Sequence, residues 1–258
     1  MPASIAAIAA KLGPAARRFD IDVLASCDST NAVLLARAEA GAASGTVIIA
    51  EEQTAGRGRR GRQWFASPGD SLTFSLLWRF VPGTSPAGLS LAIGVAVARA
   101  VAKMGVSKLA LKWPNDILLD GRKLGGILVE LLPGAPHAAV IGIGLNLRLP
   151  AGMPEDVRGA SAAICTGDDA TGPNDICASL LLELLATLES FSDGGFAALR
   201  GEWMAHHAFQ DVPVRLLSDF GPPRAGICRG VDGDGALLLE VDGRVERVLS
   251  GEVSLRPA

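Results

Sequence analysis

The sequence predicts an α/β domain followed by a small all-β unit. Between residues 21 and 207, β-prone runs alternate with segments of helical periodicity. Beyond Gln210, four short strand runs are separated by Asp-Gly turns, which is typical of a small β unit of about 45 residues. Hydrophobic residues make up 49% of the 258 residues and charged residues 20%, which excludes a disordered or collagen-like chain. We place the boundary between residues 209 and 210.

The first half of the chain begins with a strand run and a helix. Ile21 to Ala25 is β-prone, and Ser29 or Thr30 could cap a helix that runs toward Gly41. The next expected elements are a strand at 47–50, a glycine- and arginine-rich loop that ends near residue 69, a strand at 71–80 and a helix around 86–104.

The second half is richer in strands. Short runs at 109–112 and 117–119 precede Asp120-Gly121, which is a strong hairpin signal. Strands at 123–132 and 139–147 follow, then an irregular segment at 149–173, where prolines and glycines gather. Asn174 or Asp175 is expected to open a helix at 176–188, and a second helix could cover 195–207. The β unit is expected to contain strands at 214–217, 226–230, 236–241 and 245–249.

Composition limits the classes of protein that remain. The net charge of −3 argues against a protein that coats nucleic acid or an anionic membrane. The four cysteines are widely spaced and the histidines form no metal-ligand pattern with them, which favours reduced thiols in a cytosolic protein. The N-terminus lacks a basic segment before its apolar stretch, so we expect no signal peptide. Arg99 and Lys103 interrupt the longest apolar run, Leu89 to Val106, which indicates an amphipathic helix rather than a membrane span.

The most informative stretch is QTAGRGRRGRQW, from Gln53 to Trp64, which holds four arginines within six residues. Its glycines satisfy G-x-G-x-x-G, but no helix pattern follows until about residue 86, so we reject a dinucleotide-binding fingerprint. Guanidinium groups suit carboxylate and phosphate oxygens, and glycines leave a loop mobile. The stretch could therefore close over an anionic substrate, bind nucleic acid or form a solvated surface loop.

Four further motifs each allow a functional and a purely structural interpretation. KWPND (112–116) could present Asn115 and Asp116 to a ribose or a metal-bound water, or form an ordinary Asx turn. RKLGGIL (122–128) could aim Lys123 at a ligand, or place it on an edge strand to discourage aggregation. IGIGLN (141–146) could keep one strand face clear for a ligand or make a tight sheet contact. Ser29-Thr30-Asn31 could cap a helix or read a neutral polar head group.

Taken in order, these segments resemble biotin protein ligases, the enzymes that attach biotin to biotin-dependent carboxylases. STN, QTAGRGRRGRQW, KWPND, RKLGGILVE, IGIGLN and the tail GALLLE…GEVSLR carry the resemblance, which covers about residues 20 to 256. It implies a class II synthetase-like catalytic domain (residues 1–209), with a mixed, largely antiparallel sheet flanked by helices. A small SH3-like β-barrel (residues 210–258) would follow.

The resemblance also implies roles for individual residues. Catalytic roles fall to Lys123, Arg57, Arg59 and Arg62. Biotin would contact Ser29, Thr30, Asn31, Gln53, Gly56, Arg57, Lys123, Gly125 and Gly126. ATP and the adenylate would contact Arg59, Arg60, Arg62, Trp64, Asn115, Asp116 and Asn146, with Asp116 as a candidate ligand of Mg²⁺.

The implied partner is the biotin carboxyl carrier protein of acetyl-CoA carboxylase. Some relatives carry a DNA-binding module before this region, and because only 28 residues precede Ser29, we expect no repressor activity and no nucleic-acid partner. A homodimer could form through a sheet edge, for which strand 139–147 is the candidate. A lipoate or octanoate ligase on a related fold is the alternative, but the intact arginine loop and KWPND count against it. A nucleic-acid-binding module is disfavoured by the few aromatics, 5% of residues, and by the acidic residues of the β unit.

Overall fold

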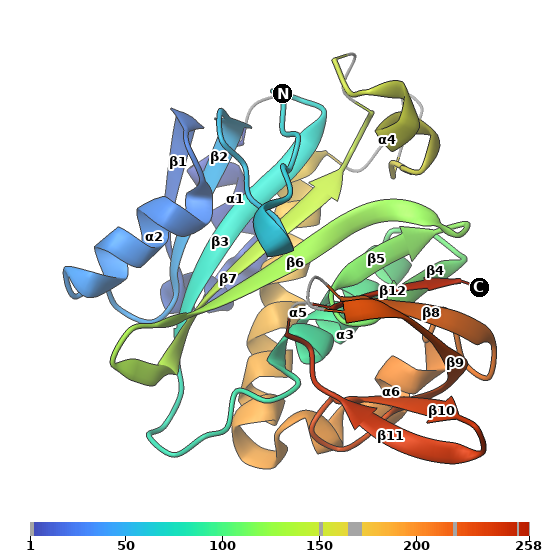
Figure 1. Ribbon diagram of the computed structural model, residues 1–258. Coiled ribbons are helices and arrows are strands. Elements are labelled where there is room, and N and C mark those ends of the chain that lie inside the picture. The colour runs from blue at the N-terminus through green and yellow to red at the C-terminus, as the bar shows by residue number, and fades with distance from the viewer. Residues whose placement is uncertain (1–2, 150–151, 165–171, 219–220, 252, 258) are drawn as a thin grey trace.

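Two β-sheets organise the chain in the computed structural model, which describes residues 3–149, 152–164, 172–218, 221–251 and 253–257 (Figure 1). The first sheet has seven strands in the order β1-β2-β3-β7-β6-β5-β4. Their bounds are β1 Asp20–Cys27, β2 Thr46–Gln53, β3 Ser71–Arg79, β4 Leu109–Lys112, β5 Asp116–Leu119, β6 Arg122–Leu132 and β7 Ala135–Asn146. The second sheet has five antiparallel strands, β8 Pro213–Ser218, β9 Gly221–Val231, β10 Leu237–Val241, β11 Arg244–Val248 and β12 Val253–Pro257.

The first sheet is mixed and largely antiparallel, as expected. Only β1 and β2 pair in parallel among its neighbours in the described chain, and the other pairs are antiparallel. Strand β7 lies between β3 and β6, so the expectation that 139–147 forms an exposed edge for a dimer is wrong. The long apolar run of β7 reflects burial on both faces, not an unpaired edge. Strand β6 is also interior, which excludes the edge-strand interpretation of Lys123.

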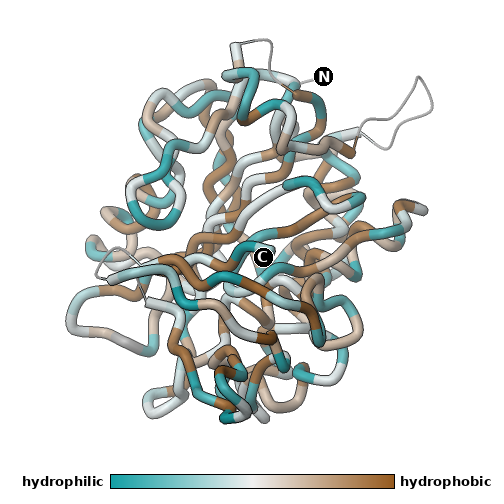
Figure 2. Tube along the Cα trace, turned by 45° about the vertical axis from the view of Figure 1, so that its right-hand side comes forward, coloured by the Kyte–Doolittle hydropathy of each residue, from teal (hydrophilic) through white to brown (hydrophobic). Residues whose placement is uncertain are grey.

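The helices cover both faces of this sheet. They are α1 Ile5–Leu12, α2 Thr30–Glu39, α3 Leu89–Lys103, α4 Glu155–Gly159, α5 Pro173–Gly194 and α6 Arg200–Ala205, with short 3₁₀ turns at Gly13–Arg18, Arg59–Gly61 and Phe196–Ala198. In β2, Val47 and Ile49 belong to the core shared with α3 and α5, whereas Ile48 belongs to the core under α2. This alternation follows the two-residue period of a strand. Figure 2 shows hydrophobic residues concentrated in the central strands.

Helix α3 is buried on nearly every side, which accounts for its long apolar run. Its two charged residues are paired: Arg99 with Glu202 at 2.5 Å, and Lys103 with Glu183. No helix in the described part of the chain is long and apolar enough to span a membrane.

Several element boundaries differ from the sequence predictions. Helix α5 starts at Pro173, which is favoured at the first helical position, rather than after Asn174 or Asp175. The expected helix at 195–207 is split into a 3₁₀ turn and the short α6. Ser29 stands at the N-cap of α2, but its side chain makes no capping hydrogen bond. Strand β12 has no counterpart among the predicted strands.

The cysteines fit the expected free thiols where the structure describes them. Cys27 is half-buried, and Cys177 and Cys228 are buried and unpaired. Burial raises the pKa of the Cys177 thiol to about 12. Cys165 lies outside the described residues.

The second sheet packs on the first domain through a continuous core. Val214, Leu216 and Leu237 belong to the same buried cluster as the central strands. The indole Nε1 of Trp113 donates to the carbonyl of Gly235 at 3.0 Å, which ties the two units at a fully buried point. The SH3-like barrel form and the boundary between residues 209 and 210 remain predictions.

Candidate active site

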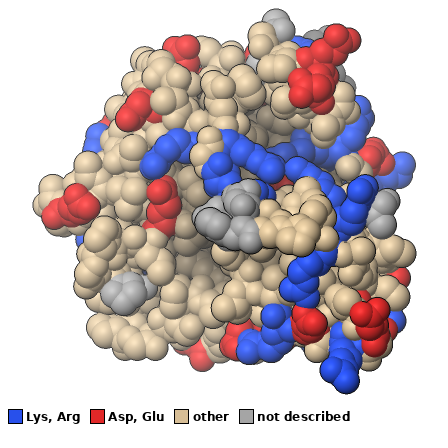
Figure 3. Space-filling model, viewed as in Figure 1, with Lys and Arg blue, Asp and Glu red and all other residues tan. Residues whose placement is uncertain are grey.

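A cavity of about 720 Å³ opens between the first sheet, the arginine loop and strand β12. A band of Lys and Arg side chains crosses the face that carries this hollow (Figure 3). The cationic side chains that line the cavity are Arg57, Arg59, Arg60, Arg62, Lys112, Lys123 and Arg256.

The arginine loop is held by its own backbone. Trp64 N donates to Gly56 O at 2.9 Å, and Gly58 N donates to Arg62 O at 2.7 Å. A Cβ atom at Gly56 would stand 2.5 Å from the Trp64 carbonyl oxygen, so this approach requires glycine. The loop contains only a 3₁₀ turn at Arg59–Gly61, and the element that follows it is β3, not an α-helix, which confirms that the G-x-G-x-x-G match is no dinucleotide fingerprint.

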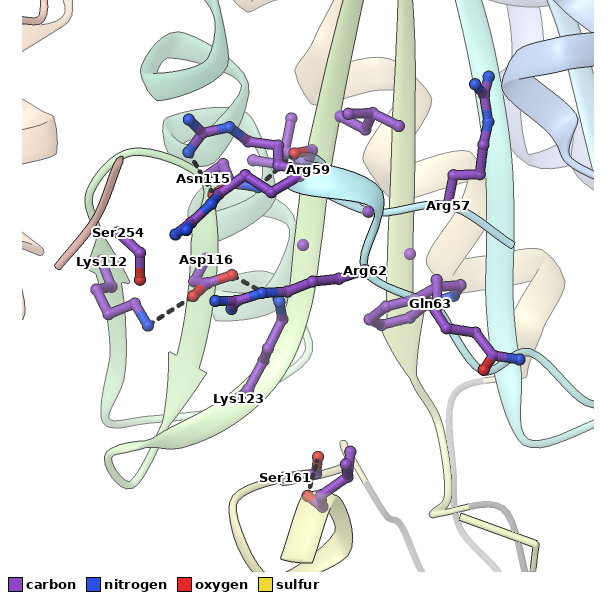
Figure 4. A pocket seen from close by; sticks show the side chains of 18 of the residues that line it. Arg57, Arg59, Arg62, Gln63, Lys112, Asn115, Asp116, Lys123, Ser161 and Ser254 are labelled. Atoms are coloured by element: carbon purple, nitrogen blue, oxygen red, sulfur yellow. Dashed lines mark hydrogen bonds and ion pairs between the residues drawn. The ribbon is translucent and has the colours of Figure 1, made fainter. Parts of the chain in front are cut away.

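The arginines of the loop point in different directions. Arg59 Nη1 lies 3.4 Å from Asn115 Oδ1, and its Nη2 donates to the carbonyl oxygens of Ser250 and Gly251 in the second unit. Arg57 points away from Arg59 and Arg62 and contacts Glu130 (Figure 4). The loop therefore contacts β6 on one side and the C-terminal unit on the other.

Asp116 stands between two lysines at the floor of the cavity. Its Oδ2 lies 2.6 Å from Lys112 Nζ, and its Oδ1 lies 2.6 Å from Lys123 Nζ (Figure 4). Burial opposes ionisation, but the charges and hydrogen bonds of the two lysines outweigh it and lower the pKa of Asp116 from 3.8 to about 2. Burial also lowers the pKa of Lys112, against the attraction of Asp116. Two ammonium groups thus share one carboxylate, which leaves a net positive charge.

The described residues do not form a cage that would hold a magnesium ion by protein ligands alone. Magnesium prefers carboxylate and water oxygens, and both carboxylate oxygens of Asp116 already contact lysines. Among the residues that the structure describes, no group of three or more His, Cys, Asp or Glu side chains is arranged to hold a metal. The assignment of Asp116 to Mg²⁺ remains a prediction that this arrangement does not favour.

Small polar side chains gather at the other end of the cavity. Gln53 Oε1 accepts from Thr30 N at 2.7 Å and from Thr30 Oγ1 at 3.1 Å. Ser75 Oγ donates to Asn31 Oδ1 at 2.5 Å and lies 2.8 Å from Thr30 Oγ1. Ser29, Thr30, Asn31 and Gln53 all line the cavity. The start of α2 therefore presents a cluster of hydrogen-bonding groups to the cavity and has no side-chain cap.

Glycines in β6 and β7 make room for the side chains around the cavity. A Cβ atom at Gly142 would stand 2.2 Å from Asn31 Oδ1, and one at Gly144 would stand 2.5 Å from the Trp64 ring. A Cβ atom at Gly125 would meet the Gly144 carbonyl oxygen at 2.5 Å, which is a tight sheet contact. Gly142 and Gly144 therefore leave space for two side chains that line the cavity, and ligand contact along this face of β7 stays a prediction.

The two asparagines hold neighbouring backbone. Asn115 Nδ2 donates to Ile127 O at 2.8 Å, and Asn146 Nδ2 donates to Ala162 O at 3.0 Å. Both residues line the cavity, and Asn146 is buried. Their amide nitrogens hold the backbone and the Asn115 oxygen contacts Arg59, so contact of either residue with a ligand would use its oxygen.

The structure brings nearly all of the expected site residues together. Gly56 and Gly125 are the exceptions, since neither lines the cavity, although both stand beside residues that do. Sequence reasoning gave no role to Lys112, Ser75, Glu130 or Arg256. Lys112 carried a signal, because it opens the KWPND segment, and a hairpin over that segment pairs Lys112 with Asp116 across its two strands. Ser75 and Arg256 sit in ordinary strand patterns, and only the folded chain brings them to the site.

Comparison with known proteins agrees with this arrangement. The Biotin/lipoate A/B protein ligase family matches residues 23–146, and the biotin protein ligase C-terminal domain matches residues 212–256. The Escherichia coli bifunctional ligase/repressor BirA is 42% identical over 92% of this chain and 74% of its own. The Mycobacterium tuberculosis biotin–[acetyl-CoA-carboxylase] ligase is 39% identical over 90% of this chain and 88% of its own. The Aquifex aeolicus biotin protein ligase in complex with biotin and ATP superposes with a TM-score of 0.79 at 28% identity, covering 93% of this chain and 99% of that one. The chain therefore belongs to the Biotin/lipoate A/B protein ligase family, and within it to the biotin protein ligases.

Proposed function

We propose that the chain activates biotin with ATP and then transfers it to a lysine of an acceptor protein. One observation carries the proposal: a single cavity joins a neutral, hydrogen-bonding end to a strongly cationic end. A substrate that fits both ends has an uncharged polar head and an anionic tail. Biotin has this form, with a ureido ring at one end and a carboxylate at the other.

In the first step, the biotin carboxylate attacks the α-phosphorus of ATP. The new bond joins a carboxylate oxygen to phosphorus, the bond to the leaving pyrophosphate breaks, and biotinyl-5′-AMP forms. Two anions must approach each other, so the chief task of the protein is to orient them and offset their repulsion. No protein nucleophile is required.

Lys123 is the cation best placed to assist this step. Its ammonium is anchored by Asp116, and its side chain is 41% exposed toward the cavity. A fixed cationic donor at the reacting oxygens is worth roughly 3 kcal/mol of transition-state stabilisation. Arg59 and Arg62 would contact the phosphates from the loop, and Trp64 would pack near the adenine.

The head group would bind at the opposite end of the cavity. Thr30, Asn31 and Gln53 offer donors and acceptors to a ureido ring, and Gly126 lets the valeryl chain pass along β6. A magnesium ion that arrives with ATP would rely on phosphate oxygens and water, since the chain offers it no unpaired carboxylate at Asp116.

In the second step, an acceptor lysine amine attacks the acyl carbon of the mixed anhydride, and AMP leaves. The expected acceptor is the biotin carboxyl carrier protein of acetyl-CoA carboxylase.

The deciding experiment is ATP–pyrophosphate exchange with biotin and lipoate side by side. Biotin should support exchange, and lipoate should support less than about one hundredth of it, because buried hydrogen-bonding groups left unpaired by the dithiolane ring disfavour its binding. Equal exchange with lipoate, or none with biotin, would overturn the proposal.

A further inference from the structure

Glu130 has no part in the chemistry proposed above, yet it contacts both halves of the biotin-binding region. Its Oε2 accepts from Asn31 Nδ2 at 2.7 Å. Arg57 Nη2 lies 3.3 Å from the same oxygen and 3.4 Å from Oε1. One carboxylate therefore joins the head-group cluster on α2 to the arginine loop.

The contact with Asn31 fixes the orientation of that amide. Asn31 is 3% exposed, its Nδ2 donates to Glu130 and to Leu128 O at 3.3 Å, and its Oδ1 accepts from Ser75. A carboxylate can only accept, so the NH₂ group must face β6 and the oxygen must face Ser75. Glu130 thus selects one of the two amide orientations that the space would allow.

The contact with Arg57 lies where two cavities meet. A second cavity of about 320 Å³ is lined by Arg57–Gly61, Leu128 and Glu130, and Leu128 with the first arginines of the loop also lines the main cavity. Glu130 is the acidic residue in the lining of this second cavity, opposite three arginines. The contact between Arg57 and Glu130 therefore joins the loop to β6 at this junction.

We propose that Glu130 is a positioning residue that orients Asn31 and holds Arg57 of the loop against β6, so that head-group recognition and retention of the adenylate depend on the same carboxylate. This inference rests on the proposed function. It predicts that substitutions of Glu130 can change retention of the adenylate without changing recognition of the head group.

Glu130→Gln keeps an oxygen that can accept from Asn31 but removes the charge opposite Arg57. The KM for biotin in ATP–pyrophosphate exchange should stay within about twofold, while biotinyl-AMP should dissociate about threefold faster, as expected for loss of a partly exposed ion pair. Glu130→Ala removes both contacts, so the KM for biotin should also rise about tenfold. The KM for ATP should change little in either variant.

The full chain is assayed in two ways, by exchange kinetics and by chasing preformed biotinyl-AMP with excess unlabelled adenylate. Arg57→Gln and Glu130→Gln are measured singly and together. The double variant should release the adenylate no faster than the faster of the two single variants, because both substitutions break the same contact. Glu39→Gln, an exposed carboxylate at the end of α2, serves as the matched control and should match the wild type. Circular dichroism and thermal melting check that each variant is folded.

The inference would be overturned if the increase in adenylate release in the double variant equalled the product of the increases in the two single variants. It would also be overturned if Glu130→Gln released the adenylate at the wild-type rate. Unfolding of both Glu130 variants would also overturn it, in favour of a structural role. If the wild type itself shows no biotin-dependent exchange, the proposed function fails instead, so the two failures are distinguishable.

Discussion

Asp116 is ionised although burial opposes its charge, because Lys112 and Lys123 each contact one of its oxygens. Its pKa falls from 3.8 to about 2. An acid whose pKa is lower in the folded state stabilises the fold above its unfolded pKa and loses that effect as the pH falls toward its folded pKa. The stabilisation is therefore full above about pH 5 and is lost between there and about pH 2.

Asp116→Asn should therefore lower the free energy of unfolding by about 2 kcal/mol at pH 7, and by roughly half of that at pH 3. Urea unfolding of both proteins at the two pH values measures the difference. A difference that does not change with pH would show that the charge of Asp116 is not the cause.

Lys123→Ala should nearly abolish adenylate formation, with a loss of at least about a hundredfold in biotin-dependent pyrophosphate exchange. The fold should persist, because Asp116 keeps Lys112 as a partner. Lys108→Ala is the matched control, since Lys108 is 74% exposed and pairs with Asp120 at the surface. Near-normal pyrophosphate release by Lys123→Ala would remove this lysine from the mechanism.

At the scale of elements, β7 is the strand that shapes the cavity. Gly142 of this strand lies under Asn31, and Gly144, two residues further along, lies under Trp64. Each glycine therefore accommodates a side chain that we assign to a different substrate, and substitutions on one strand should separate the two.

Gly142→Ala should raise the KM for biotin and Gly144→Ala should raise the KM for ATP, each by about tenfold or more, because the added Cβ would displace Asn31 from the head group or Trp64 from the adenine. Exchange kinetics with each substrate varied in turn measure both constants. Gly201→Ala, where the added Cβ meets open space, should change neither. Equal effects of both β7 variants on both constants would indicate general damage to the strand.

The sequence predicted the elements whose pattern is local. The central strands were identified because burial on both faces leaves continuous apolar runs. The hairpin was identified from the Asp120-Gly121 pair, which suits a turn that needs positive φ, and the two residues have φ of 48° and 76°. Strand β12 was missed, since five residues after a glycine carry too little pattern and gain their partner only from β8. The start of α5 was misplaced because a polar cap residue was expected where Pro173 already begins the helix.

In the candidate site too, the features with a local sequence pattern were predicted and those that depend on distant residues were not. The arginine loop was evident because four guanidinium groups within six residues have few structural uses. The contacts of Glu130 with Asn31 and of Arg59 with Ser250 join residues about 100 and 190 positions apart in the chain, so no local spacing reveals them.

At the scale of the whole molecule, the two units act as one body around the cavity. Strand β12 lines it from the C-terminal side, and Trp113 connects the units from within the KWPND segment. We expect one cooperative unfolding transition for the whole chain.

Trp113→Phe should lower the free energy of unfolding by about 1–3 kcal/mol, because the buried carbonyl of Gly235 loses its donor. Denaturant unfolding followed by circular dichroism measures the loss. The same unfolding curves also test the shared core, because two separate unfolding transitions in the wild type would contradict it.

The segment that joins the two units is itself part of the first sheet. Leu111 N donates to His206 O at 2.7 Å and Ala208 N donates to Leu111 O at 2.9 Å, so residues 206–208 run along the outer side of β4. For protein engineering, this makes the junction a poor place to cut the chain or to insert a tag or a partner domain. The turn at Pro133 and Gly134, where the backbone leaves β6 for β7 and no neighbour crowds Gly134, is the position where an insertion should cost least.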